Sequence, residues 1–97
     1  MSDVPEDAPK PAQPQIHISV GDDTKHGIYA NFLAVSHSPH EFTLDFCQIQ
    51  PGQSDRLQAE VVARIRVAPT LVGKIIRALN TNMTNYEDAY GLVKEIG

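Results

Sequence analysis

The sequence has one cysteine and no long apolar run. Because Cys47 is the single cysteine among 97 residues, no disulfide can form within the chain, which fits a reducing compartment. No apolar stretch approaches the roughly 20 residues of a membrane-spanning helix. The acidic, proline-rich start also lacks the basic residues and apolar centre of a signal peptide. We therefore expect a cytoplasmic protein that does not associate with membranes.

Motifs for catalysis and for ligand binding are lacking as well. The six glycines are scattered singly, so the chain has no phosphate-binding loop. No set of nucleophile, base and oxyanion donors accompanies Cys47. His26 and His37 lie eleven residues apart, about 36 Å along an extended strand, and cannot bind one metal ion within a single chain. We predict no enzyme activity, no catalytic residue, no metal site and no cofactor.

Charge is unevenly distributed along the chain. The net charge of −4 argues against a general polyanion-binding protein. Between Arg56 and Arg77, however, five basic residues accompany one acidic residue, Glu60, which is compatible with a local basic patch. The first fifteen residues contain four prolines and three carboxylates but little to bury. We predict a disordered acidic tail over 1–15 and one α+β domain over 16–97.

Alternation of apolar and polar residues predicts four strands. The run 28–36 is apolar on both faces, which is typical of a strand in the middle of a sheet, and a second subunit is one candidate to cover it. Alternation after the turn at Ser38-Pro39-His40 loses its phase near Gln48, where we expect the strand to end or to bulge. The four predicted strands cover 16–20, 28–36, 42–47 and 61–67, with arginines on the outer face of the last.

A helical pattern follows the strands. Pro69 suits the first helical position, and apolar residues then recur at steps of three and four from 72 to 93. The polar stretch TNMTN at 81–85, with Thr84 and Glu87 in the spacing of a capping box, predicts an interruption. We therefore expect a helix over 70–82, a bend, and a shorter helix to about residue 90 that Gly91 ends.

These elements predict the order β-β-β-β-α. Consecutive strands are most simply joined as a four-stranded antiparallel meander, with the helix packed on one face. About 82 residues then form the folded domain, a size at which one core gives modest stability and oligomerisation is a common supplement. We therefore expect an oligomer.

Two blocks of the sequence are similar to a known family. The segment GIYANFLAVSHSPHEFTLDF and the later RIRVAP and NTNMTNYEDAYG, with their spacing, resemble domain-of-unknown-function family 3467, a family of small prokaryotic proteins. The resemblance covers residues 27 to 92, and it implies a fold but neither an activity nor ligand residues. The matching positions are Tyr29, Asn31, Ser36, Glu41, Phe42, Asp45 and Phe46 in the first block, and Arg64, Pro69, Tyr86, Glu87 and Gly91 in the second.

The leading functional hypothesis is an adaptor module that interacts with itself as a homodimer or small oligomer, and with other proteins. It depends on the doubly apolar strand and on apolar helix residues beyond those needed to cover one sheet face. The alternative is packing of the same residues within one chain. The candidate interface residues are Tyr29, Leu33, Val35, Met83, Tyr86 and Tyr90.

The rival hypothesis is binding of single-stranded nucleic acid. Aromatic rings and cations on one sheet face suit stacked bases and phosphates, although Asp45 on that face and the negative net charge weaken this interpretation. The arginines are equally compatible with protection of a polar edge strand, and a chaperone-like role for the sheet is a third option. The candidate nucleic-acid-binding residues are Lys25, Tyr29, Asn31, Arg64 and Arg66.

Overall fold

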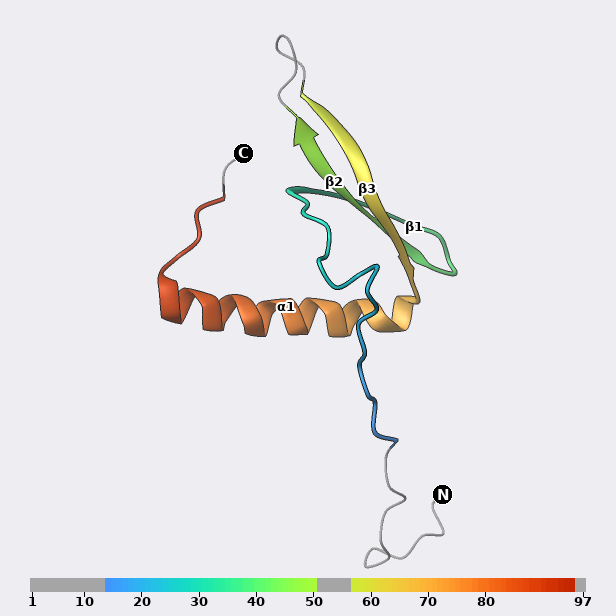
Figure 1. The fold of residues 1–97 in the computed structure, drawn as a ribbon, viewed down its shortest axis with the longest axis horizontal. Helices are drawn as coiled ribbons and strands as arrows, with labels where there is room; N and C mark the ends of the chain where they lie inside the picture. Colours follow the sequence, from blue (N-terminus) through green and yellow to red (C-terminus); the bar gives the residue numbers. More distant parts are fainter. Residues whose placement is uncertain (1–13, 51–56, 96–97) are drawn as a thin grey trace, which may run out of the picture.

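The computed structural model describes residues 14–50 and 57–95. Its elements are β1 (Phe32–His37), β2 (Phe42–Gln50), β3 (Gln58–Val67) and α1 (Pro69–Tyr90) (Figure 1). The strands form one antiparallel sheet in the order β1-β2-β3, and the helix follows them. The predicted α+β class, antiparallel meander and C-terminal helix are confirmed, but the sheet has three strands among the described residues and not four.

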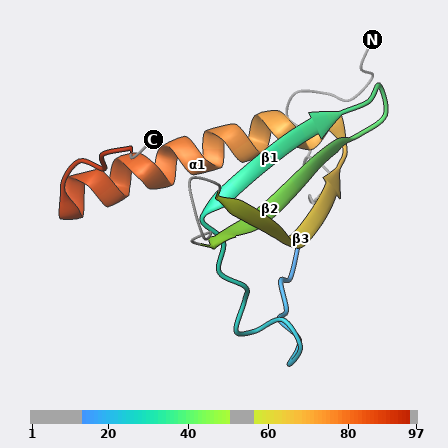
Figure 2. The ribbon, with the colours of Figure 1, turned by 90° about the horizontal axis from the view of Figure 1, so that it is seen from above.

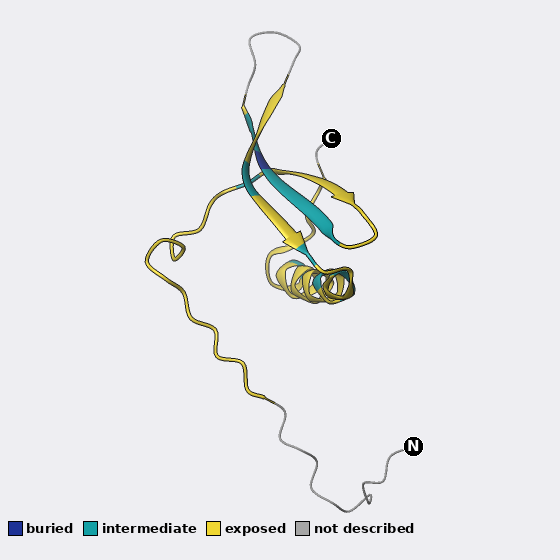
Figure 3. Cartoon of the chain, turned by 90° about the vertical axis from the view of Figure 1, so that its right-hand side faces the viewer, coloured by how far each residue is buried: buried dark blue, intermediate teal, exposed yellow. Residues whose placement is uncertain are grey.

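The prediction of a strand at 16–20 is wrong for this chain. Residues 16–20 have no regular secondary structure and run away from the sheet (Figures 1 and 3). Ile16, Ile18 and Val20 are 86%, 88% and 63% exposed. The alternation is present, but a strand also needs a neighbouring strand to bond with. Of the predicted tail at 1–15, residues 1–13 lie outside the described residues.

The central position predicted for the strand at 28–36 is also wrong. The strand begins at Phe32, lies at the edge of the sheet and is exposed throughout. Before it, the Asn31 N–H still donates to the Cys47 carbonyl at 2.9 Å. Side chains add two further bonds to β2, because the Asn31 Oδ1 accepts the Ile49 N–H and the Gln48 Nε2 donates to the Tyr29 carbonyl, each at 2.8 Å. The middle strand is β2, because short-range hairpins pair it with both neighbours.

Pairing of β2 with β3 changes register once. Phe46 lies opposite Ala63, but the next residue, Cys47, lies opposite Val61, so that Val62 is the extra residue of a bulge. The irregularity predicted near Gln48 is thus present, and β2 continues through it to Gln50. β3 begins at Gln58, before the predicted boundary at 61, and residues 51–56 of the predicted loop lie outside the described residues.

The register divides the sheet into two unlike faces. We call one the apolar sheet face, and it carries Leu33, Val35, Phe42, Leu44, Phe46, Ile65 and Val67. The opposite one is the polar sheet face, which carries Ser36, Thr43, Asp45, Arg64 and Arg66, together with Phe32 and Ala34 of β1. Cys47 follows on this second side near the bulge, where it is 3% exposed and its Sγ lies 3.4 Å from the Asp45 carbonyl.

The helix is continuous over 22 residues, so the predicted bend is wrong. Asn82 and Thr84 do not interrupt it, and their side chains donate to the carbonyls of Ala78 and Asn80 one turn earlier, at 2.8 and 3.0 Å. Thr84 therefore lies inside the helix and not at a capping box.

Both predicted ends of the helix are confirmed. Pro69 is in the first turn, where its missing N–H leaves no helical hydrogen bond unmade. Gly91 follows the last residue with φ 99° and donates its N–H to the Glu87 carbonyl at 2.8 Å. The side chain of Glu87 also accepts the Val93 N–H at 3.1 Å. The chain thus leaves the helix with its last turn bonded.

The helix lies beside the sheet at its start and projects beyond it at its end (Figure 2). Val72, Gly73 and Ile75 are half-buried, and no residue of α1 is buried. The prediction that the helix covers one sheet face therefore holds for its first turns only. None of the helices in the described ranges is both long and apolar enough to span a membrane.

Candidate interaction surface

Apolar side chains dominate the surface of the described residues. Cys47 is the one buried residue there, whereas 19 large hydrophobic residues are between 43% and 88% exposed (Figure 3). A folded domain normally encloses most of its Val, Ile, Leu and Phe side chains. Contiguous exposed apolar patches are typical of surfaces that bind another molecule.

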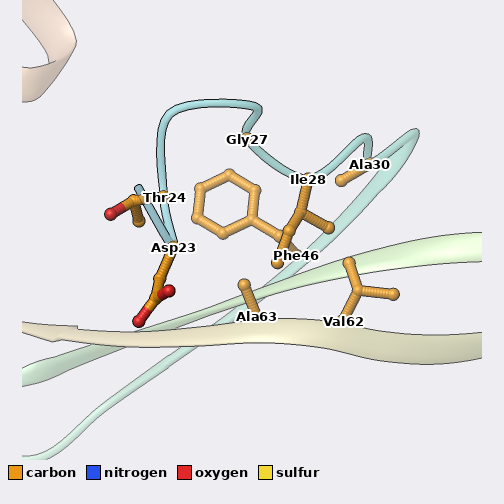
Figure 4. Close-up of a pocket in the computed structure, with 8 residues that line it drawn as sticks. All are labelled: Asp23, Thr24, Gly27, Ile28, Ala30, Phe46, Val62 and Ala63. Carbon is orange, nitrogen blue, oxygen red and sulfur yellow. The ribbon is translucent and has the colours of Figure 1, made fainter. Parts of the chain in front are cut away.

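The apolar sheet face is partly covered by the segment before β1. Ile28 and Ala30 lie over Phe46, and together with Val62 and Ala63 of β3 they line a hollow of about 340 Å³. Figure 4 shows the Phe46 ring between β3 and the turn that carries Thr24 and Gly27. Toward the free edge of the sheet this cover ends, and Leu33 and Val35 are about half exposed. The β1 part of the face is therefore open.

The projecting end of α1 presents a second apolar surface. Its members, which we call the helix stripe, follow the three-and-four spacing of one helix face. The rings of Tyr86 and Tyr90 lie 5.0 Å apart at 51°, and both are at least half exposed. A shallow hollow follows this surface. The helix stripe consists of Leu79, Met83, Tyr86 and Tyr90.

Two ion pairs involve the arginines of the polar sheet face, one with β2 and one with the turn before it. Arg64 binds Asp45 with two hydrogen bonds, from Nε at 2.6 Å and from Nη2 at 3.0 Å. Arg66 reaches Glu41 with its Nε at 3.3 Å. The hydrogen bonds from Arg64 lower the pKa of Asp45 from its ordinary value of 3.8, and Asp45 in turn raises the pKa of Arg64. Each arginine is therefore neutralised by its own partner.

The structure separates the residues predicted to bind nucleic acid. Arg64 and Arg66 share the polar sheet face with Asp45, as the alternation indicates. Tyr29 and Asn31 lie instead beside Gln48 and Ile49, toward the other end of β2, roughly 10 to 20 Å further along at 3.3 Å per residue. Asn31 uses its side-chain oxygen to hold the backbone of β2. Lys25 pairs with Asp22 at 3.6 Å on the surface.

The residues predicted for an interface are all exposed. Leu33 and Val35 lie together on the apolar sheet face of β1, whereas Met83, Tyr86 and Tyr90 lie along the helix stripe. Tyr29 precedes β1 and is also exposed. The structure thus places these residues on two surfaces, one on the sheet and one on the helix, with the helix stripe projecting away from the sheet (Figure 2).

The turn histidines have local structural contacts. The His37 ring stacks on Phe42 with 5.3 Å between centroids. At the turn, Ser38 Oγ accepts the N–H groups of His40 and Glu41 at 3.1 and 3.3 Å. Over residues 14–50 and 57–95, no three His, Cys, Asp or Glu side chains are grouped so that they could hold a metal ion.

Two features of these surfaces escaped the sequence interpretation. The Glu41–Arg66 pair joins the hairpin turn to β3, and the hollow over Phe46 joins residues 23–30 to Val62. Both depend on strand register across many residues of sequence. For the Glu41–Arg66 pair, the available signal was an acidic residue directly before an alternating strand. No local sequence pattern indicates the hollow over Phe46.

Comparison with known families identifies the chain. The family described as "Protein of unknown function (DUF3467)" matches residues 1–95, so the chain belongs to that family. The match extends beyond the predicted resemblance at 27–92 and includes nearly the whole chain. Neither the curated proteins nor the solved structures gave a match.

Proposed function

We propose that this protein is a homo-oligomeric interaction module without catalytic activity, in which a second copy covers apolar surface that one chain leaves exposed. The observation that carries the proposal is the combination of one buried residue, Cys47, with 19 exposed large hydrophobic residues in the described part of the chain. Obligate oligomers bury such surface against each other, and their interfaces resemble a core divided in two.

The two exposed surfaces have the composition of an interface. Leu33 and Val35 extend the apolar sheet face to its free edge, and the helix stripe adds a methionine and two tyrosines. Aromatic residues and methionine are enriched at interfaces, while charged residues are depleted at their centres. A small domain also gains stability from oligomerisation when its own core is small. These features support self-association as the function of the exposed surface.

Sedimentation of the full chain tests the proposal. At micromolar concentration we expect the mass of two or more chains, each of 10.7 kDa. Replacing Leu33→Glu together with Tyr86→Glu should yield a monomer or abolish folding, because charged groups cannot be buried without partners. The matched control, Gln58→Glu with Asn80→Glu, adds the same charges to the sheet and to α1 outside β1 and the helix stripe and should keep the mass. A wild-type monomer, or a Leu33 and Tyr86 variant with unchanged mass and melting temperature, contradicts the proposal.

Single-stranded nucleic-acid binding remains the alternative hypothesis, and it has weaker support. Arg64 and Arg66 each pair with a carboxylate, so the polar sheet face offers little net positive charge to phosphates. The same sedimentation run with a labelled single-stranded oligonucleotide separates the hypotheses. Binding that weakens with salt, and weakens further after Arg64→Ala with Arg66→Ala, favours the alternative.

A further inference from the structure

Residues 16–20 have the sequence of a strand but no partner. Ile16, Ile18 and Val20 alternate with polar residues, and the segment is extended and exposed (Figure 1). In the described part of the chain its backbone makes no hydrogen bond to the sheet. Unpaired backbone groups in an apolar, alternating segment favour addition to the edge of a sheet.

The outer edge of β1 is open to such a strand. β1 pairs with β2 on one side, and no other described strand lies on its second side. Its sequence, FLAVSH, contains neither a proline nor a Lys, Arg, Asp or Glu residue, and these are the residues that normally protect edge strands. The opposite edge strand, β3, carries Glu60, Arg64 and Arg66. The two edges of the sheet therefore differ, and β1 is the one without protection.

The chain's own path separates residues 16–20 from the β1 edge in the same copy. A turn with bonds from Thr24 and Lys25 to the Gly21 carbonyl and from Gly27 to Thr24 reverses the chain. Gly27, with φ 68°, adopts a conformation that favours glycine. Ile28 then lines the same hollow as Phe46 of β2 and Val62 and Ala63 of β3 (Figure 4). Reaching its own β1 edge would require this contact to open, whereas a second copy presents the same edge freely.

We infer that residues 16–20 of one copy add as an outer strand to the β1 edge of a second copy, and that the exchange is reciprocal. This inference rests on the proposed function and names the contact that forms the oligomer. Each sheet then has four strands, with Ile16, Ile18 and Val20 on the apolar sheet face beside Leu33 and Val35. Main-chain hydrogen bonds between residues 16–20 and β1 supply the affinity of the two copies for each other. The alternation of apolar and polar residues in 16–20 determines which side of the added strand is apolar.

Proline substitutions in the full chain test the strand addition. Two neighbouring residues of an edge strand point their N–H groups to opposite sides, so His17→Pro or Ile18→Pro must remove one hydrogen bond to the partner. We expect at least one of the two variants to raise the dissociation constant of the dimer tenfold or more. The fold of each chain should not change, because the segment is exposed in the single chain. Gln13→Pro, three residues before the segment, is the matched control and should leave the dissociation constant unchanged.

A mixed-labelling experiment identifies which copy provides the edge. In a mixture of ¹³C-labelled and unlabelled chains, filtered nuclear Overhauser effects between the methyl groups of Ile16 or Ile18 and those of Leu33 or Val35 must arise between copies. Their observation supports the inference, and effects confined to one copy overturn it.

The outcomes for the inference and for the proposed function are distinguishable. A wild-type monomer contradicts the proposed function and the inference together. A dimer that both proline variants leave intact overturns the strand exchange and leaves self-association standing. A dimer that dissociates with proline at position 17 or 18 but not at position 13 supports both.

Discussion

β2 and β1 are neighbouring apolar strands that differ in the number of their partners. β2 pairs on both sides, and its residues from Phe42 to Ile49 are half-buried or buried. β1 pairs on one side, and all its residues are exposed although they are as apolar. Burial in this sheet therefore follows the number of neighbours and not the hydrophobicity of the strand. An edge strand leaves one row of backbone N–H and C=O groups unpaired, which is a template for pairing with another chain.

The difference in burial between β2 and β1 can be measured by the same substitution at one leucine in each strand. In dilute solution, where chains are separated, Leu44→Ala in β2 should lower the free energy of unfolding by about 2 kcal/mol. Leu33→Ala in β1 should lower it by about 1 kcal/mol, because much of that side chain is already in water. Urea unfolding monitored by circular dichroism gives both values.

Equal losses for the two leucines in dilute solution would contradict the difference in burial. The loss for Leu33→Ala should then grow with protein concentration, because the proposed self-association would bury the β1 surface, and a partner that binds the folded state stabilises it. The loss for Leu44→Ala should depend less on concentration.

A similar contrast exists along α1 between its start beside the sheet and its projecting end. Gly91→Ala should destabilise the protein by about 1 kcal/mol, since Gly91 has φ 99° and ψ 170°, a conformation that glycine alone adopts readily. Gly73→Ala should stabilise it by about 0.5 kcal/mol, because alanine favours the helix and the added Cβ meets only the flexible end of Arg77 at 3.4 Å. Thermal unfolding compares the two variants. A stabilising Gly91→Ala would contradict the observed helix end.

The smallest expected effect concerns the ion pairs that join β2 to β3. Removing the guanidinium by Arg64→Ala should raise the pKa of Asp45 toward its ordinary value, whereas Arg66→Ala should not. NMR titration of the Asp45 carboxyl measures this shift. Because the folded-state pKa of Asp45 is lowered, the stability that it contributes is fully present above its ordinary pKa of 3.8. That contribution should disappear as the pH falls through the folded-state pKa, and an unchanged titration in Arg64→Ala would contradict the role of the pair.

Local sequence was sufficient to predict most elements but not their neighbours. The alternation around Phe42 and Leu44, the turn at Ser38 and the helix limits at Pro69 and Gly91 are all present in the structure. The bend predicted at 81–85 is absent, because low helix propensity is a weak preference that a helix continuing on both sides overrides. The strand predicted at 16–20 is absent because no neighbouring strand pairs with it. The β-propensity of these residues is not enough to form a strand without such a neighbour.

The candidate surfaces were predictable to a similar extent. Periodicity placed Met83, Tyr86 and Tyr90 on one helix face, and alternation placed Arg64 and Arg66 on one sheet face. The partners of the two arginines depend on strand register. Asp45 was expected on the same face, but its bidentate bond to Arg64 and the Glu41–Arg66 pair became visible only with the strands aligned.

The sequence by itself determined where strands alternate, where the chain turns and where the helix begins and ends. Each of these depends on sterics and hydrogen bonds within a few residues, as at Pro69 and Gly91. Only the tertiary structure decided that β2 is the central strand, that each arginine has an acidic partner, and that the apolar surface of β1 and the helix stripe lies open. These features depend on contacts between residues far apart in the chain, which local patterns do not specify.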